Sequence, residues 1–299
     1  MAVKFLTELY MRHFRIIVAQ TDISNLHCIF NITKSMSSEP NKSMLQIYNL
    51  SEKTRNSITS GNRIIIEAGY EQGQYGLIYD GDIVAVINSA MNGIDKLTQI
   101  IAQDGDLFLN SAFINVSYSA GQKSIDYFNQ AVGSAGGETD SITNNAKAST
   151  LPRGKVMFGN TGDYMRQFAK NEDALFFIDD GKVNLVKATD PPRGQVVSLS
   201  PSSGLIGTPE MTEDGIKGKC LLNPMLKLNG LVHIANTHVE LTSDFALSGG
   251  KLNTNIYTGI YKIIQFTHTG DNRGNDWYTE FVGIAQPGIT PVTGSSFNN

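Results

Sequence analysis

Charged residues are scarce in this sequence of 299 residues, of which they make up 17%. An average soluble domain has roughly 25%. The 24 basic and 28 acidic residues give a net charge of -4, and no run of basic residues could neutralise a series of phosphates. The composition therefore disfavours general binding of nucleic acid, and it indicates that partners cover much of the surface.

Cysteine and long apolar runs are also nearly absent. Cys28 and Cys220 are far apart and neither belongs to a Cys or His cluster, so we expect two buried thiols and neither a disulfide scaffold nor a zinc site. No segment approaches about 18 uninterrupted apolar residues. Residues 1–20 lack the continuous apolar region of a signal peptide. We therefore expect no membrane association, and synthesis and folding in the cytoplasm.

The sequence motifs of common enzymes are missing. There is no GxSxG, no phosphate-binding GxxxxGK[ST] and no GxGxxG at a strand-to-helix turn. The five histidines show no helical i, i+4 pair, and His233 and His238 would lie on opposite faces of an unbroken strand. We expect no catalytic residues, no cofactor and no metal site.

Two acidic patterns have more than one interpretation. Residues 270–276, GDNRGND, offer oxygen ligands but lack the spacing of a calcium loop, which favours a polar hairpin turn before Trp277. The pairs Asp179–Asp180 and Glu213–Asp214 stand beside glycine in turn-like sequence. Turn residues are therefore favoured over the paired carboxylates of a glycosidase.

Short runs rich in Ile, Val, Leu and Tyr predict strands in the first third of the chain. Between the third and fourth strand, residues 51–61 predict a short helix with Ser51 as its N-cap and Gly61 as its end. The predicted strands are 16–18, 28–33, 45–48, 63–67, 76–87 and 96–102.

The middle third predicts an α+β unit. Apolar residues recur at helical spacing in 122–136 and 162–173, and the Asp180-Gly181 pair predicts a tight hairpin within 174–188. Residues 133–150 are polar, which predicts an exposed loop. Pro191 and Pro192 mark a boundary, after which strands return. These strands are predicted at 196–199, 218–222, 231–234, 236–243, 259–267 and 277–284.

The two β-rich segments share an order of features. LQIYNL, GNRIIIEAG and GLIYDGDI in the first correspond to KCLLNP, NGLVHI and GIYKIIQF in the last, so that GLIYDGDI and GIYKIIQF both begin with glycine. The pattern leaves duplication and chance similarity both open.

These motifs, together with the IDDGK hairpin, HTGD and DWYTEF, resemble the hub proteins of bacteriophage tail baseplates from about residue 12 to residue 285. The resemblance implies a mainly β fold with an α+β insertion: two tube-like β-barrel domains at 1–105 and 191–287, a small α+β domain at 106–190, and a flexible tail at 288–299.

The resemblance also implies a structural role in the virion. Three chains would form a pseudo-six-fold ring that adapts the hexameric tail tube to the trimeric spike and leaves a channel for DNA. The expected partners are two further copies of the chain, the tail tube protein, the spike and other baseplate proteins. DNA would pass without specific binding, and assembly would occur in the cytoplasm of the host bacterium.

We expect partner contacts in three polar loops, bounded by Ser35 and Ser43, by Glu71 and Tyr75, and by Gly133 and Thr150. Two alternatives remain, a tail-associated carbohydrate-binding module and a cell-wall hydrolase component. Carbohydrate binding would favour exposed aromatic residues, whereas Trp277 and Tyr278 are predicted to pack inside a barrel and at its edge.

Overall fold

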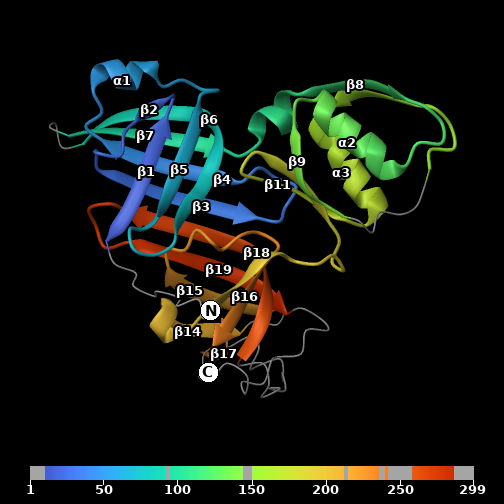
Figure 1. Ribbon diagram of the computed structural model, residues 1–299. Helices are drawn as coiled ribbons and strands as arrows, with labels where there is room; N and C mark the ends of the chain where they lie inside the picture. The colour runs from blue at the N-terminus through green and yellow to red at the C-terminus, as the bar shows by residue number, and fades with distance from the viewer. Residues whose placement is uncertain are drawn as a thin grey trace.

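The computed structural model describes residues 11–91, 95–143, 150–211, 215–235, 240–241 and 258–285. Glu213, Asp214, His238, the tail 288–299 and residues 144–149 of the predicted loop lie outside this part. The fold is mainly β with an α+β insertion, as expected. Figure 1 shows three parts: strands coloured blue to cyan, a green unit with two helices, and orange to red strands.

The first β unit folds around an apolar core because its strands alternate buried and more exposed residues. The predicted helix forms as α1 (Glu52–Ser57), where Ser51 Oγ accepts the backbone N–H of Thr54. The prediction of Gly61 as its end was wrong, because the chain is already extended at Ile58. All six predicted strands form. The strands are β1 (Arg12–Val18), β2 (Thr21–Asp22), β3 (Cys28–Ser35), β4 (Lys42–Tyr48), β5 (Arg63–Tyr70), β6 (Tyr75–Met91) and β7 (Asp95–Gln103).

The α+β unit packs two helices, α2 (Ser124–Ser134) and α3 (Thr161–Glu172), against small sheets. Their apolar faces are buried as predicted, through Phe128, Val132, Met165 and Phe168. The predicted hairpin forms from β11 (Leu175–Asp179) and β12 (Lys182–Val186), which pair antiparallel. The unit also holds the π-helical turn η1 (Leu107–Ser111), β8 (Phe113–Tyr118), β9 (Glu138–Ile142) and β10 (Lys155–Asn160).

Strand β9 lies inside the segment that was predicted to be a loop. It is an edge strand that pairs parallel with β12, and its residues ETDSI are too polar to show the alternation by which a strand is recognised. Gly133 belongs to α2, and Thr150 forms an isolated bridge with Lys123. The prediction of a loop from 133 to 150 was therefore wrong for residues 133–134 and 138–142.

The second β unit repeats the strand-rich character of the first around its own core. Within the strand predicted at 236–243, the structure describes residues 240–241, which form a short strand; the other residues of this prediction lie outside the described part. The strands are β13 (Arg193–Leu199), β14 (Leu205–Met211), β15 (Gly215–Leu221), β16 (Gly230–Ala235), β17 (Glu240–Leu241), β18 (Thr258–Asp271) and β19 (Trp277–Ala285), with a short 3-10 turn η2 (Pro201–Ser203).

Strand pairing supports the internal repeat. The order β3-β4-β7-β6-β5-β1 in the first unit matches β14-β15-β19-β18-β16-β13 in the second. Both long hairpins carry a register shift at the same place, between Ile83 and Ala85 in β6 and between Ile263 and Gln265 in β18. One difference is that β1 pairs antiparallel with β5, whereas β13 pairs parallel with β16.

The register shifts correct one detail of the sequence comparison. They align Ile83 of β6 with Ile263 of β18. The sequence comparison aligned Gly76 with Gly259 instead, and that alignment is shifted by three residues. A strand repeats its pattern every two residues and gives a weak alignment signal, whereas a bulge marks a unique position.

The two β units are joined by main-chain pairing. Strand β3 of the first unit pairs antiparallel with β18 of the second over seven residue pairs, from Gln265–Ser35 to Asp271–Ile29, so that both belong to one 14-stranded sheet. Trp277 of the second unit packs into the core of the first, beside Phe14 and Phe30. Side-chain packing and sheet hydrogen bonds therefore hold the two units in a fixed relation.

Candidate functional site at the junction of the three units

A buried lysine lies where the three units meet. In β3 the core-facing positions are Cys28, Phe30 and Ile32, and the next one is Lys34, whose side chain has no exposed surface. Strand alternation places it on the apolar face. A buried ammonium group is costly unless carboxylates pair with it, so its partners define the junction.

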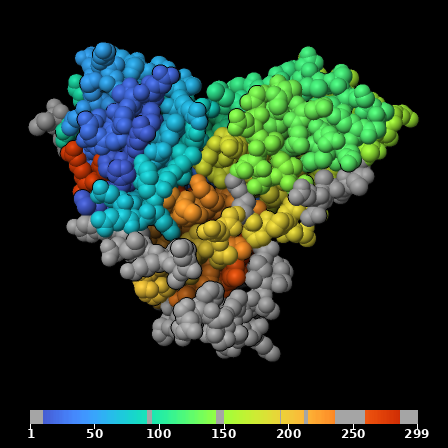
Figure 2. Space-filling model, viewed as in Figure 1, coloured from blue at the N-terminus to red at the C-terminus, as the bar shows by residue number. Residues whose placement is uncertain are grey.

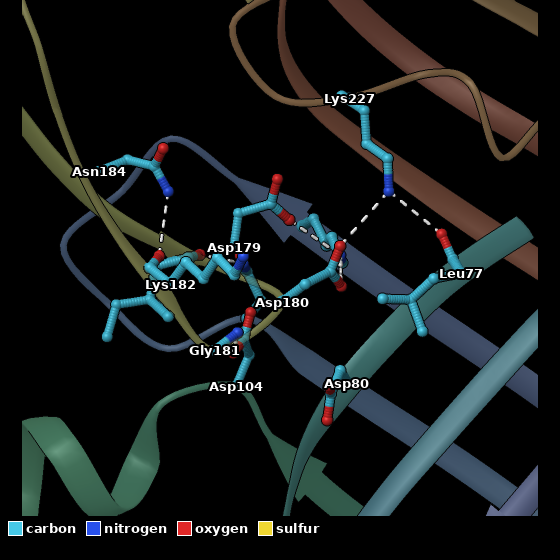
Figure 3. Close-up of polar contacts among 12 residues, drawn as sticks. Leu77, Asp80, Asp104, Asp179, Asp180, Gly181, Lys182, Asn184 and Lys227 are labelled. Atoms are coloured by element: carbon cyan, nitrogen blue, oxygen red, sulfur yellow. Dashed lines mark hydrogen bonds and ion pairs between the residues drawn. The ribbon is translucent and has the colours of Figure 1, made fainter. Parts of the chain in front are cut away.

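Those partners come from the hairpin of the α+β unit. Lys34 Nζ lies 2.8 Å from Asp179 Oδ1 and also donates to Asp180 Oδ1. Lys227, in the loop between β15 and β16, donates to the other oxygen of Asp180 at 3.3 Å and to the carbonyl of Leu77 in β6 at 3.1 Å (Figure 3). The hairpin tip therefore bridges both β units.

The backbone of the hairpin tip is shaped by its sequence. Asp180 and Gly181 have φ angles of 52° and 77°, the conformation of a two-residue hairpin turn that Asp-Gly favours. Asp104, at the end of β7, accepts the Gly181 N–H at 2.6 Å, and Asn41 donates to the carbonyl of Ile178 at 2.7 Å. Asp180 is a turn residue, as predicted, whereas Asp179 is the last residue of β11. The ion pairs of Asp179 and Asp180 with Lys34 and Lys227 connect the three units, and we call them the hairpin lock, or the lock.

The charges of the lock stabilise one another. Burial alone lowers the pKa of Lys34, but the nearby carboxylates of Asp179, Asp180 and Asp104 outweigh it and the pKa is raised. The pKa of Asp180 is lowered because Lys34 and Lys227 outweigh the opposite effect of burial. Burial raises the pKa of Asp104 to about 7. Lys34 therefore stays charged, and the pKa of Asp104 lies near neutrality.

Two cavities adjoin the lock, between the first β unit and the α+β unit. Their volumes are about 450 Å³ and about 500 Å³, and they share Arg63, Asp80, Gly136 and Gly181, so we treat them together as the junction cleft. Figure 2 shows these two units meeting at a notch at the top of the view. Seven carboxylates line the cleft: Asp80, Asp82, Asp104, Glu138, Asp140, Asp179 and Asp180.

Other residues singled out in the sequence have ordinary structural places. Within the described residues, no three His, Cys, Asp or Glu side chains are grouped to hold a metal ion. His233 is hydrogen-bonded to Ser198 at 3.2 Å. Asp271 accepts the N–H groups of Arg273 and Gly274, which confirms the polar hairpin turn. Both cysteines are buried thiols, as predicted.

None of the helices in the described part of the chain has the length and apolar character needed to cross a membrane.

The residues that bound the candidate interface loops lie in different surroundings. Ser35 is half-buried at the end of β3, and Ser43 is buried in β4. Glu71 is exposed in the turn after β5, and Tyr75 begins β6 with 37% of its surface exposed. Among the described residues of the third segment, those that line the junction cleft are Ala135, Gly136, Gly137, Glu138 and Asp140.

An exposed apolar face lies on the two-stranded sheet of the α+β unit. Phe113 in β8 and Phe158 in β10 are 54% and 65% exposed, and their rings meet edge to face at 4.7 Å. Val156 on the same face is 68% exposed. Clustered exposed apolar side chains are typical of protein contact surfaces.

Two solved structures with the same fold are tail proteins. The 43 kDa tail protein of prophage MuSo2 from Shewanella oneidensis matches with a TM-score of 0.62 and 9% identity, over 92% of this chain and 97% of that one. A tail protein from Neisseria meningitidis MC58 matches with a TM-score of 0.59 and 9% identity, over 94% and 98%.

A type VI secretion component, c3393 of E. coli, matches with a TM-score of 0.55 and 10% identity, over 94% of this chain and 80% of that one. That protein is structurally similar to the T4 bacteriophage tail proteins gp27 and gp5. No curated protein sequence matches this chain.

The family model described as "Baseplate hub gp41" matches residues 18–239, which span most of the first β unit, the α+β unit with its hairpin lock and part of the second β unit. The chain therefore belongs to the baseplate hub gp41 family and has a structural role in a phage tail baseplate.

Proposed function

We propose that this chain is the non-catalytic hub of the baseplate, in which three copies form a ring with pseudo-six-fold symmetry. The observation that carries the proposal is the repeated strand order, because it gives one chain two similar β units. Three such chains present six similar units to a hexameric tail tube while they keep three-fold symmetry toward a trimeric spike.

The fixed relation of the two β units supports this role. A ring closes only if each chain holds its two units at a constant angle. The pairing of β3 with β18 and the contacts of Lys34 supply that rigidity from two directions, through the sheet and through the hairpin tip.

In this proposal the partners are the tail tube protein, the spike and other baseplate proteins. The loops bounded by Ser35 and Ser43, by Glu71 and Tyr75, and by Gly133 and Thr150 are candidate contacts. DNA passes through the channel without specific binding, which agrees with the net charge of -4. The chain acts in the virion after assembly in the host cytoplasm, and it needs no cofactor.

Trp277 and Tyr278 give the carbohydrate-binding alternative no support. Trp277 is 2% exposed and packs with Phe30 at 5.5 Å between ring centroids. Tyr278 is half-buried, with Lys219 Nζ 3.4 Å from its ring centroid. The prediction that Trp277 packs inside a β core is confirmed.

Electron microscopy of the purified chain, alone and with co-expressed tail tube and spike proteins, tests the proposal. The expected particles are rings with an open centre, six inner densities and three outer lobes, which would be the α+β units. Closed particles without a central opening, or rings with a number of inner densities other than six, would contradict the proposal.

A further inference from the structure

A groove runs beside β13, where the second β unit meets the first. Its volume is about 770 Å³, within the range of about 300–1,000 Å³ that is typical of binding pockets. Its walls come from β13, from residues 221–225 at and after the end of β15, and from Gly73 and Gln74 in the turn between β5 and β6. We call it the β13 groove.

The β13 groove exposes apolar side chains. Val196 of β13 is 46% exposed and Met225 is 50% exposed, and Leu231 of β16 lines the groove with them. Among the described residues that line it, Lys227 is the one with a charge, and Asp180 holds that charge. The groove therefore suits an apolar occupant and offers little to an acidic or basic one.

The groove also follows a strand edge. Five consecutive residues of β13, 194–198, line it. Because successive side chains of a strand point to opposite faces, a cavity that contacts all five runs along an edge of the strand. One edge of β13 pairs with β16, and within the described residues no strand pairs with the other edge. A free strand edge beside an apolar groove is where an extended peptide can add as a further strand.

The described chain begins beside a wall of this groove. The carbonyl of Met11 accepts the N–H of Glu71 at 2.9 Å, and Gly73 and Gln74 of the same turn line the groove. Residues 1–10, which lie outside the described part of the chain, precede Met11 directly. An extended chain advances about 3.3 Å per residue, so these residues can reach roughly 33 Å, more than the length of the seven-residue β13.

The sequence of residues 1–10, MAVKFLTELY, fits such a site. Val3, Phe5 and Leu9 stand at alternate positions, and the charged Lys4 and Glu8 stand at the positions between them. This alternation is typical of a strand with one apolar face. In an extended conformation the apolar face would meet the groove and both charges would face water.

We propose that the β13 groove binds residues 1–10 of the same chain, as a strand along the free edge of β13 with Phe5 directed toward Val196 and Met225. A segment joined to the wall of the groove has a far higher effective concentration there than a separate molecule. The bound segment ties β1 of the first β unit to β13 of the second. Groove and segment belong to one chain, so the inference does not depend on how many chains form a ring.

Crosslinking of the full chain tests which segment occupies the groove. The double variant Thr7→Cys, Met225→Cys places one thiol on the apolar face of the segment and one in the groove, and both natural thiols are buried. We expect a short bis-maleimide to join them within one chain. The matched control is Thr7→Cys with Val156→Cys, 68% exposed in β10, which should not be joined. No link to Met225→Cys, equal links to both positions, or links only between two chains would each overturn the inference.

Hydrogen exchange of residues 193–199, measured by mass spectrometry on the full chain, tests the same contact without a crosslinker. Phe5→Ser should accelerate exchange in β13 by about tenfold or more, because the segment loses its largest buried apolar side chain. Lys4→Ser introduces the same residue one position away on the other face of the segment, and its exchange should match the wild type. Exchange in β13 that is equal in the two variants would contradict the proposal. Protection of β13 that appears only when tail proteins are added would assign the groove to a partner instead.

Discussion

At the residue scale, Lys34 has the clearest structural role. It occupies a core-facing position of β3 and is the shared partner of Asp179 and Asp180. A buried ion pair adds little compared with apolar packing, but removing one member leaves the other charge without compensation. The lock is therefore more sensitive to loss of a single partner than to loss of all of them.

We predict that Lys34→Met lowers the free energy of unfolding by about 3–5 kcal/mol, because Asp179 and Asp180 lose their buried partner. Urea unfolding measures the change. Lys42→Met, the same substitution at an exposed position of the neighbouring strand, should change it by less than about 0.5 kcal/mol. Adding Asp179→Asn to Lys34→Met should recover part of the loss. A Lys34→Met protein as stable as the wild type would contradict the prediction that the ion pairs of Lys34 stabilise the fold.

We predict that Asp104 makes stability depend on pH between about 4 and about 7. Its pKa is raised to about 7 in the folded chain, so the folded state binds its proton more tightly than the unfolded state. The resulting stabilisation is complete below the unfolded pKa of about 3.9 and is lost as the pH rises through about 7.

The measurement compares wild type with Asp104→Asn, which keeps an oxygen to accept the Gly181 N–H. Relative to the wild type, the variant should gain roughly 1 kcal/mol for each unit from pH 5 to pH 7. His268, whose pKa is well below its ordinary value because of burial, has the opposite trend but is present in both proteins. A difference between the two proteins that is constant with pH would contradict the prediction.

The residues of the junction could be recognised only in part from the sequence. Asp180-Gly181 predicts the turn, because its conformation is set locally. Lys34 is separated in the sequence from Asp179 by 145 residues and from Asp180 by 146. Local sequence patterns carry no information on contacts between residues so far apart. The one available signal was a lysine following Cys28, Phe30 and Ile32 at alternate positions, where an apolar residue would be expected.

At the scale of elements, the hairpin tip depends on glycine at one position. Gly181 has a φ of 77° and open space around the position of a Cβ atom, so only the backbone conformation opposes a side chain there. We predict that Gly181→Ala costs about 1–2 kcal/mol of stability. Gly133→Ala, in helix α2 with equally open space, should instead stabilise the chain by about 0.5–1 kcal/mol. Thermal unfolding of both variants measures the two changes in stability. Equal effects would contradict the requirement for a left-handed backbone at Gly181.

Strands with regular alternation were predictable and irregular ones were not. β3, β5 and β19 alternate buried and partly exposed residues along their length. β14 contains Gly207 and Pro209 and pairs with a register shift, so its sequence has no clean period. β10 has apolar residues on both faces at Val156, Met157 and Phe158, which conceals the period of two. β8 is the exception, because it alternates apolar and polar residues from Ile114 to Tyr118 and still was not predicted.

At the scale of the whole molecule, the strand order carries the functional argument. Sequence periodicity predicted two β-rich segments and an α+β segment between them, but it could not show that β3 would pair with β18 or that the units would share one sheet. The expected boundaries near residues 105 and 190 stay predictions. Phe177 and Val186 of the hairpin pack into the core of the second β unit. Cores shared in this way favour cooperative unfolding of the three units.

The trimer is the central claim, and the mass of the purified chain in solution tests it most directly. Light scattering across a concentration series, with and without co-expressed tail tube and spike proteins, gives that mass relative to the 32.6 kDa chain. The account predicts three chains per particle, either alone or once the spike protein is present. A monomer that persists at every concentration and with every tail protein would contradict it.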